Sequence, residues 1–142
     1  FVAKHYKTNN MQNTQTAAKE ASVVWLSIIS SAPGTQGFVT NEEANELTKS
    51  RNALPSHVLQ DPEGFVGKAY GAKTTPHMYL IDKAGILRYQ GAIDDAGGRG
   101  FMFKDLSQAN NYIISALIEL NQGTEITDRV TKPYGCSVKY KS

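Results

Sequence analysis

The chain has 142 residues, of which 40% are apolar and 20% are charged, and its 15 lysines and arginines oppose 13 acidic residues for a net charge of +2. This length fits one folded domain, and the composition is that of a globular protein rather than a disordered one. The balanced charge argues against a nucleic-acid partner, and no apolar run approaches the ~20 residues that a membrane span needs. A single cysteine, Cys136, excludes a disulfide within this chain and a multi-cysteine metal site.

Helix and strand signals alternate along the first part of the sequence. Good helix formers and scattered apolar positions predict a helix over residues 1 to about 20. The apolar run Ser22–Ile29 predicts a strand that is buried on both faces. Residues 30–38 are rich in serine, glycine and proline, which predicts a loop, and Thr40 followed by Glu43 forms a capping box that begins a helix of about ten residues.

Three short elements follow that helix. His57–Leu59 predicts a second strand, and Asp61–Gly64 has the proline and glycine positions of a type I turn. Phe65–Tyr70 predicts a short helix, which Gly71 would end because glycine readily takes the left-handed conformation of a helix C-terminus.

The second half of the chain begins with a hairpin. The strands Met78–Asp82 and Ile86–Gly91 are joined by a tight turn and are predicted to pair in antiparallel fashion. The glycine-rich stretch Ile93–Phe103 predicts a loop. A helix with one apolar face is predicted to begin with Asp105 as its cap and to end at Gly123.

This order of elements predicts an α/β fold, with a mixed sheet and helices on both of its faces. We expect residues 1–123 to form the folded domain and residues 124–142 to form a polar tail that carries Cys136.

Two sequence features invite a chemical interpretation on their own. Thr74-Thr75-Pro76-His77 stands directly before a strand, where Pro76 fits because proline cannot donate to a strand ladder. A trans proline is the commoner arrangement there and a cis Thr75–Pro76 bond the rarer one. Asp94 and Asp95, with Arg99 nearby, are too few ligands for a hard cation, so a solvated loop is expected and no metal site.

The run from Lys68 to Leu87 resembles the second half of a thioredoxin-like domain, with a short helix, Thr75-Pro76, an apolar strand, a turn and a second strand. More closely, the chain resembles bacterial redoxin-domain proteins of the AhpC/TSA class. The motifs that carry this resemblance keep their order along nearly the whole chain: Phe1–Tyr6, Asn10–Gln12, Val23–Leu26, Ser30–Gly34, Gly91–Asp95 and Lys132–Tyr140.

The resemblance implies a thioredoxin-like mixed sheet whose N-terminal strands are missing from this chain, and a nucleophilic cysteine just upstream of Phe1. A thiol at a helix N-terminus has a lowered pKa and attacks a disulfide or a peroxide. A cis Pro76 would lie opposite that thiol, Thr75 would present its backbone to a substrate chain, and Thr74 and His77 would contact the substrate. No cofactor is implied.

The family pattern is not complete at this site. Peroxiredoxins usually place an arginine near the thiolate from this part of the sheet. Here Thr74, Thr75 and His77 occupy these positions, and Arg88 lies on the following strand. This departure favours thiol–disulfide exchange over peroxide reduction.

Cys136 has two interpretations. Lys132 and Lys139 are near it in sequence, and positive neighbours lower the pKa of a thiol. It is therefore either a resolving cysteine, paired with the upstream nucleophile, or an unreactive exposed thiol.

Two functions follow from these features. The first is an antioxidant-type thiol oxidoreductase that acts on a thiol or disulfide protein or on a peroxide; the alternative is a redox-inactive binding or scaffold module on the same fold. No nucleic acid or membrane span is expected. A homo-oligomer and a periplasmic or cytoplasmic location are left open.

Overall fold

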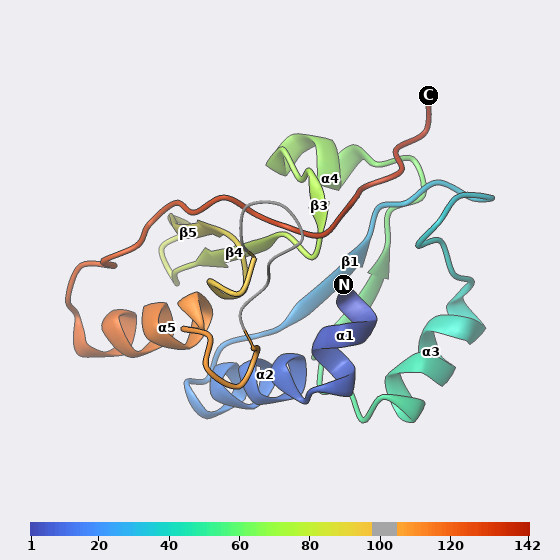
Figure 1. Cartoon of the computed structure of the whole chain (residues 1–142). Coiled ribbons are helices and arrows are strands. Elements are labelled where there is room, and N and C mark those ends of the chain that lie inside the picture. Colours follow the sequence, from blue (N-terminus) through green and yellow to red (C-terminus); the bar gives the residue numbers. More distant parts are fainter. Residues whose placement is uncertain (98–104) are drawn as a thin grey trace. The chain divides into compact units, whose positions relative to one another are not determined.

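A computed structural model describes residues 1–97 and 105–142. Within them the described sheets are all two-stranded and pair β1 with β2, β3 with β6, and β4 with β5. The class is therefore mixed α/β with small sheets, and the single mixed sheet expected from the sequence is not present in the described part of the chain. The elements, most of which are labelled in Figure 1, are α1 (Val2–Lys7), α2 (Asn10–Glu20), β1 (Leu26–Ile29), α3 (Asn41–Ser50), β2 (His57–Gln60), α4 (Phe65–Tyr70), β3 (Thr74–Thr75), β4 (Met78–Ile81), β5 (Leu87–Gly91), α5 (Tyr112–Gln122) and β6 (Cys136–Ser137).

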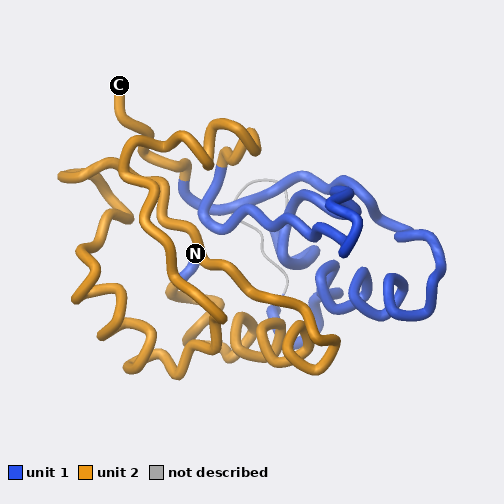
Figure 2. The backbone as a smooth tube through the Cα atoms, turned by 180° about the vertical axis from the view of Figure 1, so that it is seen from behind, with its two compact units in different colours: residues 1–2, 74–136 blue, residues 3–73, 137–142 orange. Residues whose placement is uncertain are grey.

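The chain folds into two compact units, coloured separately in Figure 2. Unit 1 contains Phe1–Val2 and Thr74–Cys136, and unit 2 contains Ala3–Lys73 and Ser137–Ser142. The first two residues therefore belong with the second half of the chain, and the last six belong with the first half. Each end of the chain is thus part of a unit whose other residues are distant from it in sequence.

The helix predicted over residues 1 to about 20 is interrupted in the structure. Asn9 takes the left-handed conformation, with φ of 60°, and separates α1 from α2. The Thr8 hydroxyl donates to the carbonyl of Lys4 at 2.9 Å, so it ends α1 by bonding back to its last turn. Asparagine tolerates left-handed backbone better than most residues, which explains why the break falls at this position.

The first strand is shorter and more exposed than the sequence predicts. β1 covers only Leu26–Ile29, because Ser22 has a left-handed backbone and Val23 N–H still bonds to the helix carbonyl of Ala18 at 2.8 Å. Leu26 is 50% exposed and Ile28 is 41% exposed. The prediction of a strand buried on both faces was therefore wrong, since an apolar run alone does not reveal whether other elements cover both faces.

The second strand confirms the sequence-based prediction. β2 lies beside β1 in parallel, with Leu26 opposite His57 and Ile29 opposite Gln60 (Figure 1).

The capping box of α3 is present. Thr40 accepts a hydrogen bond from Glu43 N–H at 3.2 Å through its hydroxyl, while the Glu43 carboxylate accepts from Thr40 N–H at 3.1 Å. These reciprocal bonds satisfy two backbone groups that a helix N-terminus otherwise leaves without partners.

Replacing Thr40 with alanine is expected to lower the free energy of unfolding by about 1 kcal/mol, because Glu43 N–H loses the hydroxyl that accepts its hydrogen bond. Urea denaturation followed by circular dichroism measures this change. Ser50→Ala, at the other end of the same helix, is the control and should cost less than about 0.5 kcal/mol. Equal costs for the two variants would show that the box does not stabilise α3.

The hairpin of unit 1 confirms the predicted pairing. β4 and β5 are antiparallel, with Met78 opposite Gly91, and the register shifts between Leu80 and Ile81. Leu80 and Tyr89 are buried, so one side of the hairpin faces the core of unit 1. That core is completed by small and apolar residues from the segment after β5, from α5 and from the segment after it: Ala92, Ile93, Ala96, Ile113, Ala116, Leu117 and Ile126.

The last helix begins later than predicted. Asn111, not Asp105, is its N-cap and accepts a hydrogen bond from Ile114 N–H at 2.9 Å. Asp105 instead accepts from Ser107 N–H at 2.9 Å in a local turn. Gly123 ends the helix with φ of 70°, as predicted. Aspartate side chains bond readily to a backbone N–H two residues ahead, so a cap and a turn look alike in sequence.

Candidate active site

The residues singled out in the sequence meet where β3 pairs with β6. Thr75 belongs to β3, and its hydroxyl donates to the carbonyl of Cys136, 61 residues away in sequence, at 3.2 Å. Cys136 is a free, half-exposed cysteine. The structure therefore brings Cys136 beside Thr75, which is the residue directly before Pro76.

The backbone around Pro76 is fixed by its own neighbours. The Thr75–Pro76 peptide bond is cis. The Thr74 hydroxyl donates to the carbonyl of Pro76 at 2.8 Å, which closes the turn between β3 and β4. His77 stacks on Tyr79, with ring centroids 4.7 Å apart. Thr74 and His77 thus flank the turn, and both have structural contacts there.

Gly135 allows the chain before Cys136 to approach β3. Its φ of 132° is one that residues with a side chain rarely adopt. A Cβ at this position would overlap the carbonyl of Thr75 and would also lie 3.5 Å from the Cβ of Phe1. Only glycine fits here, and the approach places Phe1, Thr75 and Gly135 against one another.

Tyr134 anchors the segment just before this glycine. Its hydroxyl donates to the carboxylate of Asp94, which is only 1% exposed and also accepts from Ala96 N–H at 3.0 Å. The ring of Phe1 meets the ring of Tyr134 edge to face, with centroids 6.0 Å apart. Burial raises the pKa of Tyr134, and the hydrogen bond to Asp94 and its negative charge raise the pKa further. The phenol therefore stays neutral and keeps donating.

Thr131 holds the same segment against β5. The main chain of Gln90 bonds to the main chain of Arg129 and Thr131, each at 3.0 Å. The Tyr89 hydroxyl shares a hydrogen bond with the Thr131 hydroxyl at 2.6 Å and donates to the carbonyl of Ala92 at 2.5 Å. Tyr89 is fully buried, and burial is the largest cause that raises its pKa to about 12. The expected polar tail is thus packed into unit 1 as far as Cys136.

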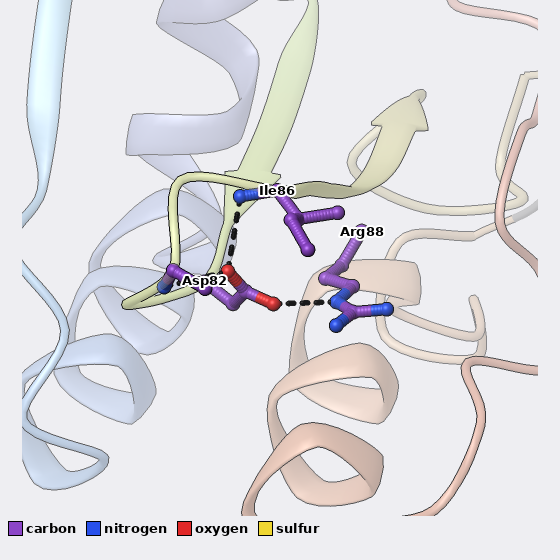
Figure 3. Close-up of polar contacts among 4 residues, drawn as sticks. Asp82, Ile86 and Arg88 are labelled. Atoms are coloured by element: carbon purple, nitrogen blue, oxygen red, sulfur yellow. Dashed lines mark hydrogen bonds and ion pairs between the residues drawn. The ribbon is translucent and has the colours of Figure 1, made fainter.

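Arg88, the arginine on the strand β5, forms an ion pair with Asp82. Arg88 donates through Nε to the carboxylate of Asp82 at 2.6 Å, and the same carboxylate accepts from Ile86 N–H at 3.0 Å (Figure 3). The bond from Ile86 N–H has the largest effect in lowering the pKa of Asp82, and the bond from Arg88 and a further backbone bond within the turn lower it too. Arg88 therefore stabilises the turn between β4 and β5.

Unit 2 has its own buried carboxylate, Asp61. It accepts from the Ser30 hydroxyl at 2.7 Å and from Gly67 N–H at 2.9 Å. Burial by itself would raise the pKa of Asp61. The hydrogen bonds from Gly67 N–H, from the Ser30 hydroxyl and from two further N–H groups of α4 outweigh burial and hold the pKa below its usual value. This carboxylate joins the loop after β1 to the first turn of α4.

The last six residues of the chain cover the same part of unit 2. Val138 N–H donates to the carbonyl of Lys73 at 3.1 Å, and the Tyr140 hydroxyl donates to the carbonyl of Ala72 at 2.6 Å. The Lys139 ammonium, which the sequence places near Cys136, donates to the carbonyl of Ser137 at 3.0 Å.

The remaining candidates have structural partners. Asp95 accepts from Asn110 N–H at 2.8 Å, which holds the loop before α5 in place. Arg99, with the rest of the predicted glycine-rich loop at residues 98–103, lies outside the described residues. Sequence reasoning missed the roles of Tyr134 and Gly135 at the site; the one available signal was a glycine placed directly before the sole cysteine.

Comparisons with known proteins give a fold and no activity. No protein-family profile matches this sequence, and no curated protein matches it. A solved structure of a hypothetical protein from Sinorhizobium meliloti 1021 is similar, with a TM-score of 0.71 and 25% identity over 91% of this chain and 71% of that chain. An uncharacterized conserved protein from Geobacillus kaustophilus has a TM-score of 0.71 and 23% identity over 90% of this chain and 68% of that chain.

In residues 1–97 and 105–142 each helix is too short or too polar to cross a bilayer.

Proposed function

We propose that this protein is a thiol-dependent oxidoreductase with a thioredoxin-like fold, acting by thiol–disulfide exchange or peroxide reduction. The observation that carries the proposal is the pairing of β3 with β6, which brings the sole cysteine of this chain beside Thr75, the residue directly before Pro76. The sequence resemblance to redoxin-domain proteins supports the same assignment.

In the proposed reaction a nucleophilic cysteine precedes Phe1, as the resemblance implies. The position of Phe1 supports this proposal, because its ring contacts Tyr134 and its Cβ would lie 3.5 Å from a Cβ at Gly135, the residue before Cys136. With a peroxide, the thiolate attacks the terminal oxygen, the O–O bond breaks, and the alkoxide or hydroxide leaves while the sulfur becomes a sulfenic acid. The Cys136 thiol then displaces the hydroxyl as water, and a disulfide forms.

With a disulfide substrate the reaction consists of two successive thiol–disulfide exchanges. The nucleophilic thiolate attacks one substrate sulfur, forms a mixed disulfide and releases the other sulfur as a thiolate. Cys136 then attacks the enzyme sulfur, which releases the second half of the substrate as a thiolate. Because Arg88 is held by Asp82, no described arginine of this hairpin is available to bind a peroxide oxygen, which favours the disulfide reaction.

The test uses the full-length protein, reduced and then mixed with hydrogen peroxide or oxidised glutathione. Intact-mass and peptide mapping should find Cys136 in a disulfide. Cys136→Ser should stop at the sulfenic acid or mixed disulfide, and this intermediate should decay at least about tenfold more slowly than in the wild type, because an intramolecular thiol acts at high effective concentration.

Ser137→Ala is the matched control and should react like the wild type. If Cys136→Ser forms the same products at the same rate, the resolving role is wrong. If the reduced wild-type protein reacts with neither oxidant beyond the rate of a free thiol, the oxidoreductase proposal fails and the redox-inactive binding module takes its place.

A further inference from the structure

The edge of β3 is already occupied by the chain's own C-terminal segment. β3 pairs with β6, the Thr75 hydroxyl bonds to the carbonyl of Cys136, and Gly135 lies against the carbonyl of Thr75 without room for a Cβ. The sequence resemblance instead implies that the Thr75 backbone pairs with a substrate chain. On the side that faces Gly135, an incoming polypeptide strand would therefore have to displace residues 134–136.

That segment is held by several independent anchors. In unit 1, Thr131 bonds to the Tyr89 hydroxyl at 2.6 Å and to Ala92 N–H at 2.9 Å. The Tyr134 hydroxyl bonds to the buried carboxylate of Asp94. In unit 2, Val138 N–H bonds to the carbonyl of Lys73 at 3.1 Å, one residue before β3. Anchors on both sides of Cys136 make this segment a built-in partner strand rather than a loose end.

We propose that residues 134–136 act as an internal partner strand that fills the substrate-strand position on β3, so that the site takes a small electrophile and excludes extended polypeptides. The small electrophile is a low-molecular-weight disulfide or a hydroperoxide, neither of which needs backbone pairing. This inference rests on the proposed function, whose two reactions are unchanged. It narrows the partner from a disulfide protein to a small molecule.

The test compares small oxidants, which do not pair with the backbone of β3, with an extended peptide, which would. Reduced full-length protein is mixed with oxidised glutathione, with hydrogen peroxide, or with an extended peptide that carries a disulfide, and the rate of thiol loss is measured. A substrate strand on β3 would form about two backbone hydrogen bonds, worth roughly tenfold in affinity together. The wild-type protein should therefore lack this advantage and should prefer the small oxidants.

Gly135→Ala should reverse the preference, because the new Cβ overlaps the carbonyl of Thr75 and forces the segment away from β3. We expect its rate with the peptide disulfide to rise about tenfold relative to its rate with oxidised glutathione. Gly123→Ala is the matched control, since Gly123 also has a left-handed backbone, at φ of 70°, but has open space around its missing Cβ. Its substrate preference should equal that of the wild type.

Tyr134→Phe gives a second variant in case Gly135→Ala does not fold. It removes the hydroxyl that bonds to Asp94 and should shift the preference in the same direction by a smaller factor. The inference is overturned if the wild type reacts with the peptide disulfide as fast as with oxidised glutathione, or if both variants keep the wild-type ratio.

Binding of the reduced form of the same peptide, measured by fluorescence anisotropy, separates this inference from the proposed function. Binding to Gly135→Ala and not to the wild type supports an occupied edge even if no oxidant reacts. Equal binding to both proteins contradicts the occupied edge even if the oxidants react as proposed.

Discussion

Replacing Asp61 with alanine is expected to lower the free energy of unfolding by about 3 kcal/mol. The carboxylate is buried and accepts two hydrogen bonds, from the Ser30 hydroxyl at 2.7 Å and from Gly67 N–H at 2.9 Å. Each bond to a charged acceptor contributes about 1.5 kcal/mol or more, and the buried Gly67 N–H loses its acceptor. Urea denaturation at neutral pH measures the change.

Glu63→Ala provides the control two residues away. Glu63 forms an exposed ion pair with Lys141 at 2.8 Å, and exposed pairs contribute between about 0 and 1 kcal/mol. A similar small loss in both variants would mean that the Asp61 bonds do not hold the loop to α4.

The same carboxylate predicts an acid dependence of stability. The folded pKa of Asp61 is below its usual value of 3.8, so the unfolded chain takes up the proton first as the pH falls. The stabilisation is therefore complete above about pH 4 and is lost as the pH falls through the folded pKa. The difference in unfolding free energy between the wild type and Asp61→Asn should shrink over that range, and a constant difference down to about pH 2 would contradict this.

Raising the pH from about 9 to 12 is expected to destabilise the protein by about 3 kcal/mol or more through its buried phenols. The pKa of Tyr89 is raised to about 12, chiefly by burial, from the usual 10.0. Above pH 10 the unfolded chain loses this proton while the folded protein keeps it, so stability falls by about 1.4 kcal/mol per pH unit. Tyr134, whose pKa is also raised, acts in the same direction.

Urea denaturation at a series of pH values, with ultraviolet absorbance to follow tyrosinate, measures this decline. Tyr89→Phe should be less stable at neutral pH, because the Ala92 carbonyl and the Thr131 hydroxyl lose a partner, and its alkaline decline should be shallower. Tyr70→Phe, at an exposed tyrosine, is the control and should follow the wild type. Identical alkaline slopes for Tyr89→Phe and the wild type would contradict the assignment.

Local signals in the sequence predicted the elements whose determinants are neighbours in the chain. The capping box of Thr40 and Glu43, the end of α4 at Gly71, and the turn that Asp82 organises all depend on residues within a few positions of one another. Such contacts form whatever the rest of the chain does, so a sequence pattern is enough to predict them.

The same reasoning failed where local patterns have two outcomes. The apolar run at Leu26–Ile29 is as compatible with a half-exposed strand as with a buried one, and only its surroundings decide. Asp105 has the features of a helix cap and forms a turn, because the next good cap, Asn111, is fixed by the loop that Asp95 holds.

By itself the sequence determined the mixed α/β class, most element positions, and the candidate residues Thr75, Pro76 and Cys136. The tertiary structure alone decided that Cys136 returns across 61 residues to pair beside Thr75, and that Gly135 and Tyr134 hold it there. The physical reason is that these contacts join segments remote in sequence. Their formation depends on the packing of Tyr89, Asp94 and Thr131, which no local pattern encodes.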